Sequence, residues 1–388
     1  MAIIKHREIY KKDSAGKTRV WFMEQDGGAY RTVGGQLDGK QTTSGWVYAE
    51  GKNTGKSNET TAEEQATSEI ESKYTKKLRI DYHESLDNID VEKIFKPMLA
   101  DKWEKRKDKI DYATQLVYMQ PKLDGIRCIA NSKGLWSREG KTIMCLPHIN
   151  QALAPLFAEY PELVLDGEIY NHDLKDDFET IVSIAKKTKP TEQDLEFASL
   201  LAQYHIYDMP VVPSALIPGR DGTTLDFGER HPFVALLGFP NSKHRILHAV
   251  ETVCVSSEDE VNEHYDIFLD AGYEGGMIRI DAEYKNGRSK NLLKRKDFDD
   301  AEFEILRIEE GKGNWAGYAK RFVFRNDEGA CGEFGAGVEG NQAYAKELLE
   351  NAAAYIGKKA TVQYQGRSRK ERVPRFPTVK IIHTTDRL

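Results

Sequence analysis

The sequence predicts an α+β protein in which a small mixed domain precedes a larger one and a β-barrel ends the chain. Three observations support this prediction. The chain has 388 residues, and domains commonly hold about 100–200 residues. Its first part combines strand-like runs with one helical pattern, and residues 298–388 alternate apolar and polar positions in several short runs. We therefore expect domains at residues 1–92, 93–297 and 298–388.

Composition places the chain among globular proteins. Apolar residues make up 39% and charged residues 30% of the sequence. No apolar run approaches the ~18 residues of a membrane-spanning helix, and the first residues lack the apolar stretch of a signal peptide. We expect a cytoplasmic protein without membrane contact. The net charge of −6 by itself argues against a nucleic-acid binder, because such proteins are usually basic.

The first domain is expected to be a small sheet with one helix. Thr18–Met23 and Ser44–Tyr48 are strand-like, and Thr61 with Glu64 forms the pattern of a capping box. Apolar residues then recur every fourth position, as on one face of a helix: Ala62, Ala66, Ile70, Tyr74 and Leu78.

The second domain is expected to mix strands and helices. Leu163–Leu165 and Met277–Ile280 are strand-like, and a helix is expected after Pro147. The segment from Val211 to Phe233 is rich in Pro and Gly, which predicts a surface loop.

The third domain alternates in the manner of strands and has one helical pattern, near Ala343 to Ile356. Several short strands and one helix in a domain of this size favour a small barrel of the OB type. The alternating pairs are Phe303/Ile305, Phe322/Phe324, Val362/Tyr364 and Val379/Ile381.

Two kinds of site can be set aside on spacing. The four cysteines form no CxxC pair, so we expect small buried apolar side chains rather than zinc ligands or disulfides: Cys128, Cys145, Cys254 and Cys331. Gly51–Ser57 resembles a P-loop, but only three residues separate its glycines and Glu50 precedes it. We interpret it as a solvated loop that could face DNA.

The strongest motif is Lys122-Leu-Asp-Gly-Ile-Arg127, which lies between strand-like runs at Leu116–Met119 and Cys128–Ala130. A lysine fixed at a strand edge before a glycine turn is poorly explained by packing. Its amine becomes a nucleophile when deprotonated, and neighbouring cations or burial would favour that form.

Further motifs follow in order along the chain. Asp166-Gly-Glu168 and Tyr207-Asp208 each end a predicted strand, and Glu274-Gly275 begins another. Lys294 and Lys296 lie two residues apart, so they point to one face of a strand and could hold one triphosphate. Each pattern alone is common in turns or on surfaces, but their joint occurrence around one lysine is not.

At these residues the sequence resembles the ATP-dependent DNA ligases of the covalent nucleotidyltransferase superfamily, especially the compact viral and phage enzymes. The resemblance covers Lys96 to about Asp386. Besides the motifs above, it includes Lys96–Ala100, Ser137-Arg138 and Arg372-Val-Pro-Arg375-Phe-Pro377. It implies a nucleotidyltransferase (adenylation) domain followed by an OB-fold domain.

The resemblance also implies a reaction in three steps. Lys122 attacks the α-phosphorus of ATP, the AMP donor, and releases pyrophosphate. The AMP moves to the 5′-phosphate at a nick in double-stranded DNA. A 3′-hydroxyl then attacks this activated phosphate and seals the strand. Mg²⁺ is the expected ion, since it bridges phosphates through few carboxylates. One site per chain makes a monomer sufficient.

Site residues follow from the resemblance by motif. Lys122 is the catalytic nucleophile, and Arg138 contacts the DNA 5′-phosphate. The nucleotide-binding residues are Gln120, Arg127, Glu168, Tyr207, Lys294, Lys296, Arg372 and Arg375. The metal-binding residues are Asp124, Glu168 and Glu274.

The sequence departs from the family pattern in three places. Gln120 stands where many relatives have Glu, and Tyr207 stands where Phe is common. The OB domain is too short for the DNA-encircling insertion of some viral ligases. Residues 1–92, which faintly resemble a WGR-type module, are expected to add grip on the duplex in its place.

Other functions share part of this pattern. RNA ligases and mRNA-capping guanylyltransferases also carry KxDGxR, but Arg375-Phe-Pro377 in an OB domain disfavours an RNA ligase, and capping enzymes have a different last motif. A non-catalytic DNA-binding protein with a degenerate site is disfavoured because the motif lysines and glutamates are all present.

The charge distribution removes the objection raised by the net charge. Met119–Lys141 carries +3, Lys285–Lys296 carries +6 and Lys358–Lys380 carries +7. Salt screens the distant acidic residues beyond about 10 Å. The sequence thus predicts a positive field where triphosphate and DNA backbone would bind.

Overall fold

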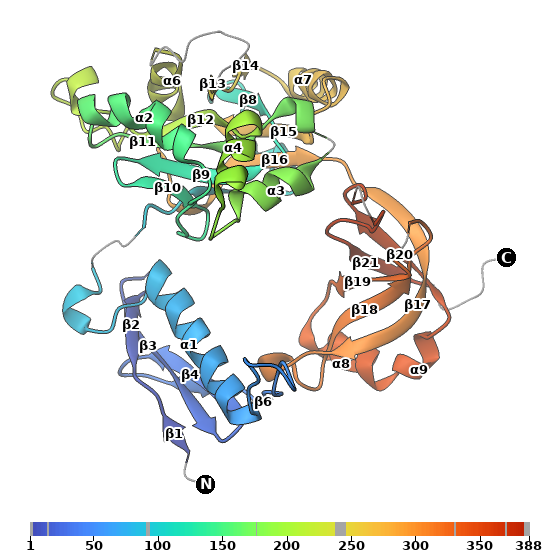
Figure 1. Ribbon diagram of the computed structural model, residues 1–388. Coiled ribbons are helices and arrows are strands. Elements are labelled where there is room, and N and C mark those ends of the chain that lie inside the picture. Colours follow the sequence, from blue (N-terminus) through green and yellow to red (C-terminus); the bar gives the residue numbers. More distant parts are fainter. Residues whose placement is uncertain are drawn as a thin grey trace. The chain divides into compact units, whose positions relative to one another are not determined.

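The computed structural model describes residues 3–13, 15–90, 94–175, 177–236, 246–329, 331–368 and 371–383 (Figure 1). It divides into two compact units. One is Phe95–Asp297, and the other comprises Met1–Ile94 and Phe298–Leu388. The predicted boundary between residues 92 and 93 lies outside the described residues.

The amino-terminal part of the second of these units is a sheet covered by helix α1 (Ala62–Ile80). Thr61 and Glu64 form the predicted capping box. Ala66, Ile70 and Tyr74 are completely buried, whereas Ala62 at the exposed first turn is not. The Tyr74 hydroxyl donates to the carbonyl of Arg7 (2.6 Å) and so ties the helix to the sheet.

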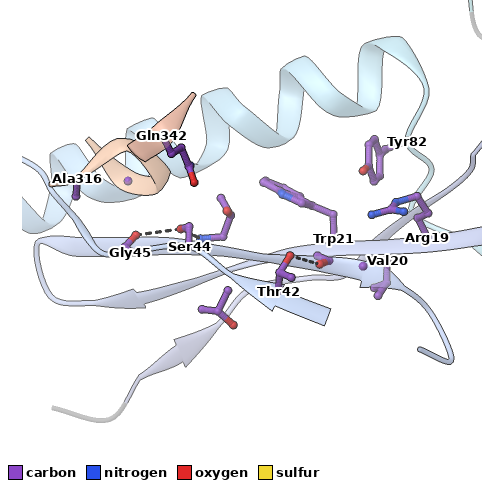
Figure 2. A pocket seen from close by; sticks show the side chains of 14 residues that line it. Arg19, Val20, Trp21, Thr42, Ser44, Gly45, Tyr82, Ala316 and Gln342 are labelled. Carbon is purple, nitrogen blue, oxygen red and sulfur yellow. Dashed lines mark hydrogen bonds between the residues drawn. The ribbon is translucent and has the colours of Figure 1, made fainter. Parts of the chain in front are cut away.

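This sheet has the strand order β1-β3-β4-β5, with β2 paired to β3 and β6 to β4. Its strands are β1 (Ile4–Lys5), β2 (Ile9–Lys12), β3 (Thr18–Asp26), β4 (Ala29–Gln36), β5 (Gln41–Thr43) and β6 (Val47–Tyr48). Figure 2 shows the hollow beside it, where Arg19, Trp21 and Tyr82 lie at one end. The Thr42 hydroxyl there donates to the carbonyl of Gly34 (3.1 Å).

The unit Phe95–Asp297 contains two five-stranded sheets. The first has the order β10-β9-β11-β12-β13, with strands β9 (Ile126–Asn131), β10 (Gly134–Ser137), β11 (Val164–Tyr170), β12 (Gln203–Val211) and β13 (Leu247–Ala249). The second has the order β14-β8-β15-β16-β7, with strands β7 (Met98–Lys102), β8 (Val117–Pro121), β14 (Val253–Val255), β15 (Gly275–Ile280) and β16 (Gly287–Lys296). Only the pairs β12–β13 and β16–β7 are parallel among the described strands of this unit.

Helices bury one face of each sheet. Ile149 of α2, Ile184 of α3 and Ala198 of α4 belong to the core of the first sheet, and Val261 and Phe268 of α7 belong to that of the second. The helices are α2 (Pro147–Glu159), α3 (Phe178–Ala185), α4 (Glu192–Leu201), α5 (Phe227–Arg230), α6 (Pro232–Leu236) and α7 (Glu258–Asp270). Short 3₁₀ turns are η1 (Leu86–Asn88), η2 (Trp103–Lys105), η3 (Lys107–Lys109), η4 (His172–Leu174), η5 (Ser214–Leu216) and η6 (Gly313–Trp315).

Two expectations for this unit were wrong. Asp166–Glu168 and Tyr207-Asp208 lie inside β11 and β12 rather than at strand ends, because buried arginines pair with both aspartates and let the strands continue. The segment from Val211 to Phe233 is not only a surface loop. It contains α5, and Phe227 is completely buried.

Residues 299–382 form a closed barrel of strand order β17-β18-β19-β21-β20, which confirms the predicted OB-type architecture. Its strands are β17 (Asp299–Glu310), β18 (Ala319–Arg325), β19 (Glu333–Val338), β20 (Lys359–Tyr364) and β21 (Thr378–Ile382). The sequence predicted one helix here, but the structure has two, α8 (Gln342–Glu350) and α9 (Ala352–Tyr355). The break occurs because Asn351 between them leaves the helical conformation. Strand β19 was not predicted from the sequence, because Gly335 and Gly337 weaken its alternation of apolar and polar residues.

The motifs set aside from sequence have ordinary surroundings. Cys128 and Cys145 are buried as expected, but Cys254 is exposed because its strand β14 is at a sheet edge. In the P-loop-like segment, the Gly55 N–H donates to the carboxylate of Glu59 (2.8 Å). Within the described residues, no helix is long and apolar enough to cross a membrane.

Candidate active site

A cavity of about 730 Å³ in the unit Phe95–Asp297 brings together predicted residues from both sheets. Those that line it are Gln120, Lys122, Arg127, Arg138, Glu168, Tyr207 and Lys294. Glu274 and Lys296 do not line the cavity. Glu274 contacts Lys122, and Lys296 contacts Glu274. Motifs separated by more than a hundred residues therefore meet at one place.

Lys122 directly follows β8 and is fixed to the start of β15. Its N–H donates to the carbonyl of Gly275 (2.8 Å), and its carbonyl accepts from the N–H of Glu274 (3.1 Å). The two side chains consequently meet, and Lys122 Nζ donates to the Glu274 carboxylate. Lys296 Nζ donates to the other carboxylate oxygen (3.0 Å). Glu274 thus holds the predicted nucleophile.

Charge around Lys122 changes the acidity of its neighbours. Burial acts to raise the pKa of Glu274, but the ammonium groups of Lys122 and Lys296 outweigh it and the pKa is lowered. Burial lowers the pKa of Lys294, and the charges of Lys296 and Lys122 lower it further. The three amines are therefore electrostatic neighbours, as expected for a site that binds phosphates.

Glu168 and Tyr207 face the cavity from neighbouring strands β11 and β12. The Tyr207 hydroxyl donates to Glu168 Oε2 (3.4 Å), and the guanidinium of Arg127 lies 5.4 Å from the Tyr207 ring centroid. Burial raises the pKa of Glu168 to about 8, although the charges of Lys122 and Arg127 oppose this. An additional cation nearby would therefore stabilise the charged form of Glu168.

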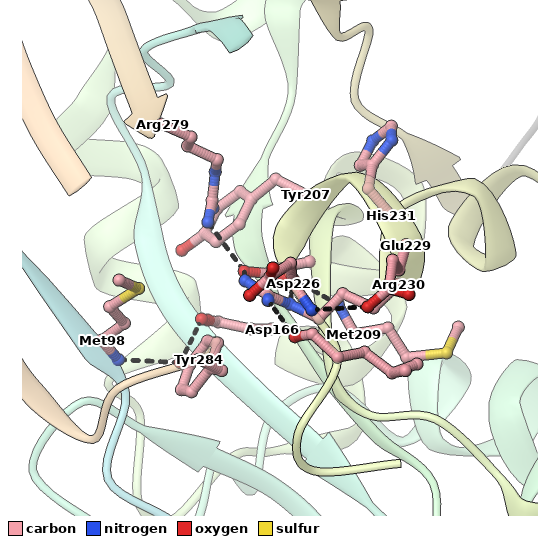
Figure 3. Close-up of polar contacts among 12 residues, drawn as sticks. Met98, Asp166, Tyr207, Met209, Asp226, Glu229, Arg230, His231, Arg279 and Tyr284 are labelled. Atoms are coloured by element: carbon pink, nitrogen blue, oxygen red, sulfur yellow. Dashed lines mark hydrogen bonds and ion pairs between the residues drawn. The ribbon is translucent and has the colours of Figure 1, made fainter. Parts of the chain in front are cut away.

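Arg127 is oriented by a buried carboxylate. Its Nε donates to Asp166 Oδ1 (2.9 Å), and the hydroxyl of Tyr284 donates to Asp166 Oδ2 (2.6 Å). Tyr284 in turn accepts from the N–H of Met98 (2.7 Å; Figure 3). Asp166 is completely buried. The first acidic residue of the Asp166–Glu168 motif therefore positions an arginine, while the second faces the cavity.

A second buried network joins Arg230 and Arg279 (Figure 3). The Asp208 carboxylate accepts from Arg230 Nε (2.7 Å) and Arg279 Nη1 (2.7 Å). Burial acts to raise the pKa of Asp208, but these two arginines lower it to about 2. The carboxylate is therefore ionised at neutral pH and is bridged by two cations.

Gln120 links this network to the cavity. Its side-chain oxygen accepts from Arg279 Nε (2.7 Å), and its side-chain nitrogen donates to the carbonyl of Tyr207 (3.0 Å) and to the hydroxyl of Thr252 (2.8 Å). Only 1% of Gln120 is exposed. A carboxylate could not donate these last two bonds. Glutamine at this position therefore fits its surroundings in this chain.

Sequence reasoning missed several residues that build the site. Arg279 carried a usable signal, because a charged residue inside the apolar strand β15 needs a buried partner. Asp166 and Asp208 belonged to motifs but were assigned no role. Arg230 and Tyr284 lie outside the motifs and had no signal of this kind.

Arg372 and Arg375 belong to the other unit and do not line this cavity. Arg372 Nε donates to Glu328 Oε2 (3.1 Å), and Arg372 has a positive φ of 55°. The guanidinium of Arg375 lies 5.6 Å from the Phe376 ring centroid. Their contacts with a nucleotide stay a prediction.

The predicted metal ligands do not form a cluster with three protein ligands. Among the described residues, no group of three or more His, Cys, Asp or Glu side chains could hold an ion. Glu168 and Glu274 do lie close enough to influence each other, since the charge of Glu274 adds to the raised pKa of Glu168. Two carboxylates suit an ion whose other ligands are phosphate oxygens and water.

Comparison with known proteins identifies the family. The family described as "ATP dependent DNA ligase domain" matches residues 97–296, which is more than half of the chain. The chain belongs to this family. All predicted residues that line the cavity lie within the matched segment.

Relatives of this ligase-family chain include viral and phage DNA ligases. A DNA ligase of African swine fever virus is 27% identical over 278 residues, which is 68% of this chain and 60% of the relative. A DNA ligase of Enterobacteria phage T4 is 26% identical over 286 residues, 62% of this chain and 58% of the relative. The chain thus matches about 60% of the length of these relatives.

Solved structures share the fold. One, described as "DNA binding with a minimal scaffold: Structure-function analysis of Lig E DNA ligases", has a TM-score of 0.58 at 23% identity and covers 75% of this chain and 100% of that chain. Another, described as "Pmar-Lig_Pre.", has a TM-score of 0.59 at 20% identity and covers 76% of this chain and 68% of that chain.

Proposed function

We propose that this protein is an ATP-dependent DNA ligase that seals nicks in duplex DNA. The observation that carries the proposal is Lys122, held by Glu274 beside a cavity inside the segment that matches the ligase family. In the first step the Lys122 amine, once deprotonated, forms a bond to the α-phosphorus of ATP, and the bond to pyrophosphate breaks. The 5′-phosphate of the nick then takes the AMP, and the 3′-hydroxyl displaces it.

The surroundings of Lys122 suit this chemistry because phosphoryl-type transfer depends on positioning and charge neutralisation. Glu274 fixes the position of the attacking amine, and Lys294 and Lys296 place positive charge where the α-phosphate would lie. Tyr207 offers its ring to adenine, and Arg127, held by Asp166, engages the nucleotide. Arg138 binds the DNA 5′-phosphate, and Arg372 and Arg375 orient the pyrophosphate.

Mg²⁺ fits the residues present. Glu168 and Glu274 are the carboxylates beside Lys122, and a cation near Glu168 would favour its charged form, which burial opposes. When bound, the ion would neutralise charge on the phosphate oxygens. Asp124 is proposed as a third metal-binding residue, as the family resemblance implies.

Incubation with α-labelled ATP and Mg²⁺ tests the first step. Wild-type protein is expected to retain label after denaturation, and Lys122→Ala to retain none. Lys133→Ala, an exposed lysine that does not line the cavity, serves as a matched control and should label like the wild type. Absence of label from the wild type would falsify the proposal.

Substrate tests separate the related enzymes. A DNA ligase should prefer ATP to GTP in the labelling assay and a nicked DNA duplex to a nicked RNA duplex in the sealing assay. Preference for GTP would indicate a capping enzyme, and preference for RNA an RNA ligase. We further propose that the protein acts as a monomer in the cytoplasm, or in the host cytoplasm if a phage encodes it.

A further inference from the structure

Two turns contribute basic residues to the cavity lining, and of these only Arg138 has a role in the assignments above. The first is the turn that follows β10, where the Ser137 N–H donates to the carbonyl of Lys141 (2.8 Å). The second is the α3–α4 turn, residues 186–190, where the Lys186 N–H donates to the carbonyl of Val182 (3.0 Å). Lys141, Lys186 and Lys187 line the cavity together with Arg138.

These four cations differ from the lysines near the nucleophile. Arg138, Lys141, Lys186 and Lys187 are all exposed, whereas Lys122 and Lys294 are partly buried. Two acidic residues accompany them: Glu139 lines the same cavity, and Asp194 forms an ion pair with Lys187 (2.5 Å). The exposed part of the cavity lining on these two turns is therefore positive in balance.

We propose that the α3–α4 turn, through Lys186 and Lys187, binds backbone phosphates of the DNA duplex next to the nick. This inference rests on the proposed ligase function. A nucleoside triphosphate is short enough to be held by the partly buried lysines near Glu274. A DNA strand, by contrast, extends beyond the nucleotide, and exposed cations on two separate elements of the cavity lining are available to it. Exposed lysines suit such contacts because they neutralise phosphates without reading sequence.

The experiment compares Lys186→Ala/Lys187→Ala with Lys189→Ala in the full-length protein. Lys189 is exposed and lies in the same turn, but it does not line the cavity. Binding of a fluorescent nicked duplex is measured by anisotropy at several KCl concentrations. Loss of two phosphate contacts should weaken binding about 60-fold at about 0.1 M KCl and reduce the slope of log K against log salt by about 2. Lys189→Ala should change the affinity by less than about twofold, since one peripheral charge contributes little.

Two further measurements make the outcome decisive. Thermal unfolding checks that the double variant remains folded, and labelling with α-labelled ATP should proceed at the wild-type rate. Unchanged DNA affinity, or a loss of labelling as large as the loss of DNA affinity, overturns the inference, the latter because it would place the triphosphate at this turn. Failure of the wild type to seal nicks would overturn the ligase function instead, and the binding comparison would still decide the role of the turn.

Discussion

Asp208 shows how single buried residues shape the site. It is completely buried, and its two arginine partners, Arg230 and Arg279, are 1% and 3% exposed. Buried ion pairs are costly to form, but removal of one partner leaves an uncompensated charge. Arg230 also donates to the carbonyls of Leu225 and Ala282 (both 2.8 Å), so several polar groups depend on it.

Replacement of Arg230 by methionine, which keeps much of its volume, should therefore be strongly destabilising. We expect the free energy of unfolding to fall by about 3–5 kcal/mol, measured by urea denaturation. Arg220→Met is the matched control, because the Arg220–Glu229 pair (2.8 Å) is exposed and should contribute little to stability. Similar losses in the two variants would contradict this account of the network.

Glu168 should make stability depend on pH. Its pKa is about 8 in the folded protein against an ordinary value of 4.5. The folded state therefore keeps a proton that the unfolded state has lost, and this contribution to stability is full below pH 4.5 and disappears as the pH rises to 8. Glu168→Gln removes the effect. The melting temperature of the variant minus that of the wild type should rise between pH 5 and pH 8, and a constant difference would count against the raised pKa.

At this scale, sequence found the residues whose chemistry is conspicuous. Lys122, Glu168, Glu274 and Lys294 were predicted from motifs that follow one another in order, and their roles from the family resemblance. Arg230 could not be found in this way, since its role depends on α5 packing beside β12. A residue of one segment that neutralises a residue of another leaves no local pattern, because the pairing is created by the fold.

At the scale of elements, glycines let the strands approach the nucleophile. Gly125 lies between Lys122 and Arg127, where a Cβ atom would be 2.3 Å from the carbonyl oxygen of Ile169 and 2.8 Å from Cγ of Glu168. Strand β11 therefore passes directly against this turn. The glycine of the KxDGxR motif is required by close packing of the strand that carries Glu168.

Gly125→Ala should consequently separate Lys122 from Glu168. We expect a loss of about 1–3 kcal/mol in unfolding free energy from overpacking and a fall of about 100-fold in the rate of labelling from ATP, because displacement of reacting groups by about 1 Å has effects of this size. Gly332→Ala is the control, since its Cβ would meet nothing within 4 Å. A Gly125 variant that labels as fast as this control would show that the turn tolerates displacement.

Elements with a strong periodic pattern were predicted well. The capped helix α1 and strands β17, β18, β20 and β21 follow from spacing alone. Other elements were misjudged where charge or glycine interrupted the pattern. Strands β11 and β12 continue through their aspartates because distant arginines pair with them, and β19 keeps its place in the barrel by main-chain pairing despite two glycines.

For the whole molecule, the distribution of charge is more informative than its sum. The net charge is −6, yet six basic residues from two of the positive stretches line the one cavity: Lys122, Arg127, Arg138, Lys141, Arg288 and Lys294. The fold thus concentrates positive charge that is dispersed along the sequence. Sequence could locate these stretches, but not show that they meet.

Residues 1–92 give the last prediction at this scale. The described residues 3–90 carry fourteen basic and fifteen acidic side chains, so a general positive field cannot explain binding to DNA. A local surface could: Lys77 Nζ lies 4.6 Å from the Trp21 ring centroid and 4.5 Å from that of Tyr82, and Lys11 Nζ lies 5.0 Å from Tyr82. Both rings are buried, so this cluster offers DNA the two ammonium groups packed against them and not the rings themselves.

If this domain adds grip on the duplex, a chain that begins at Lys93 should bind a nicked duplex about tenfold more weakly than the full chain at about 0.1 M salt, the effect of losing one phosphate contact. Its labelling by ATP should be unaffected, because every residue that lines the active-site cavity lies in the unit Phe95–Asp297. Gel-shift titration measures the affinity, and circular dichroism checks that the shortened chain is folded. If the shortened chain is folded and its affinity for the nicked duplex is unchanged, residues 1–92 do not bind DNA and the other domains alone bind the duplex.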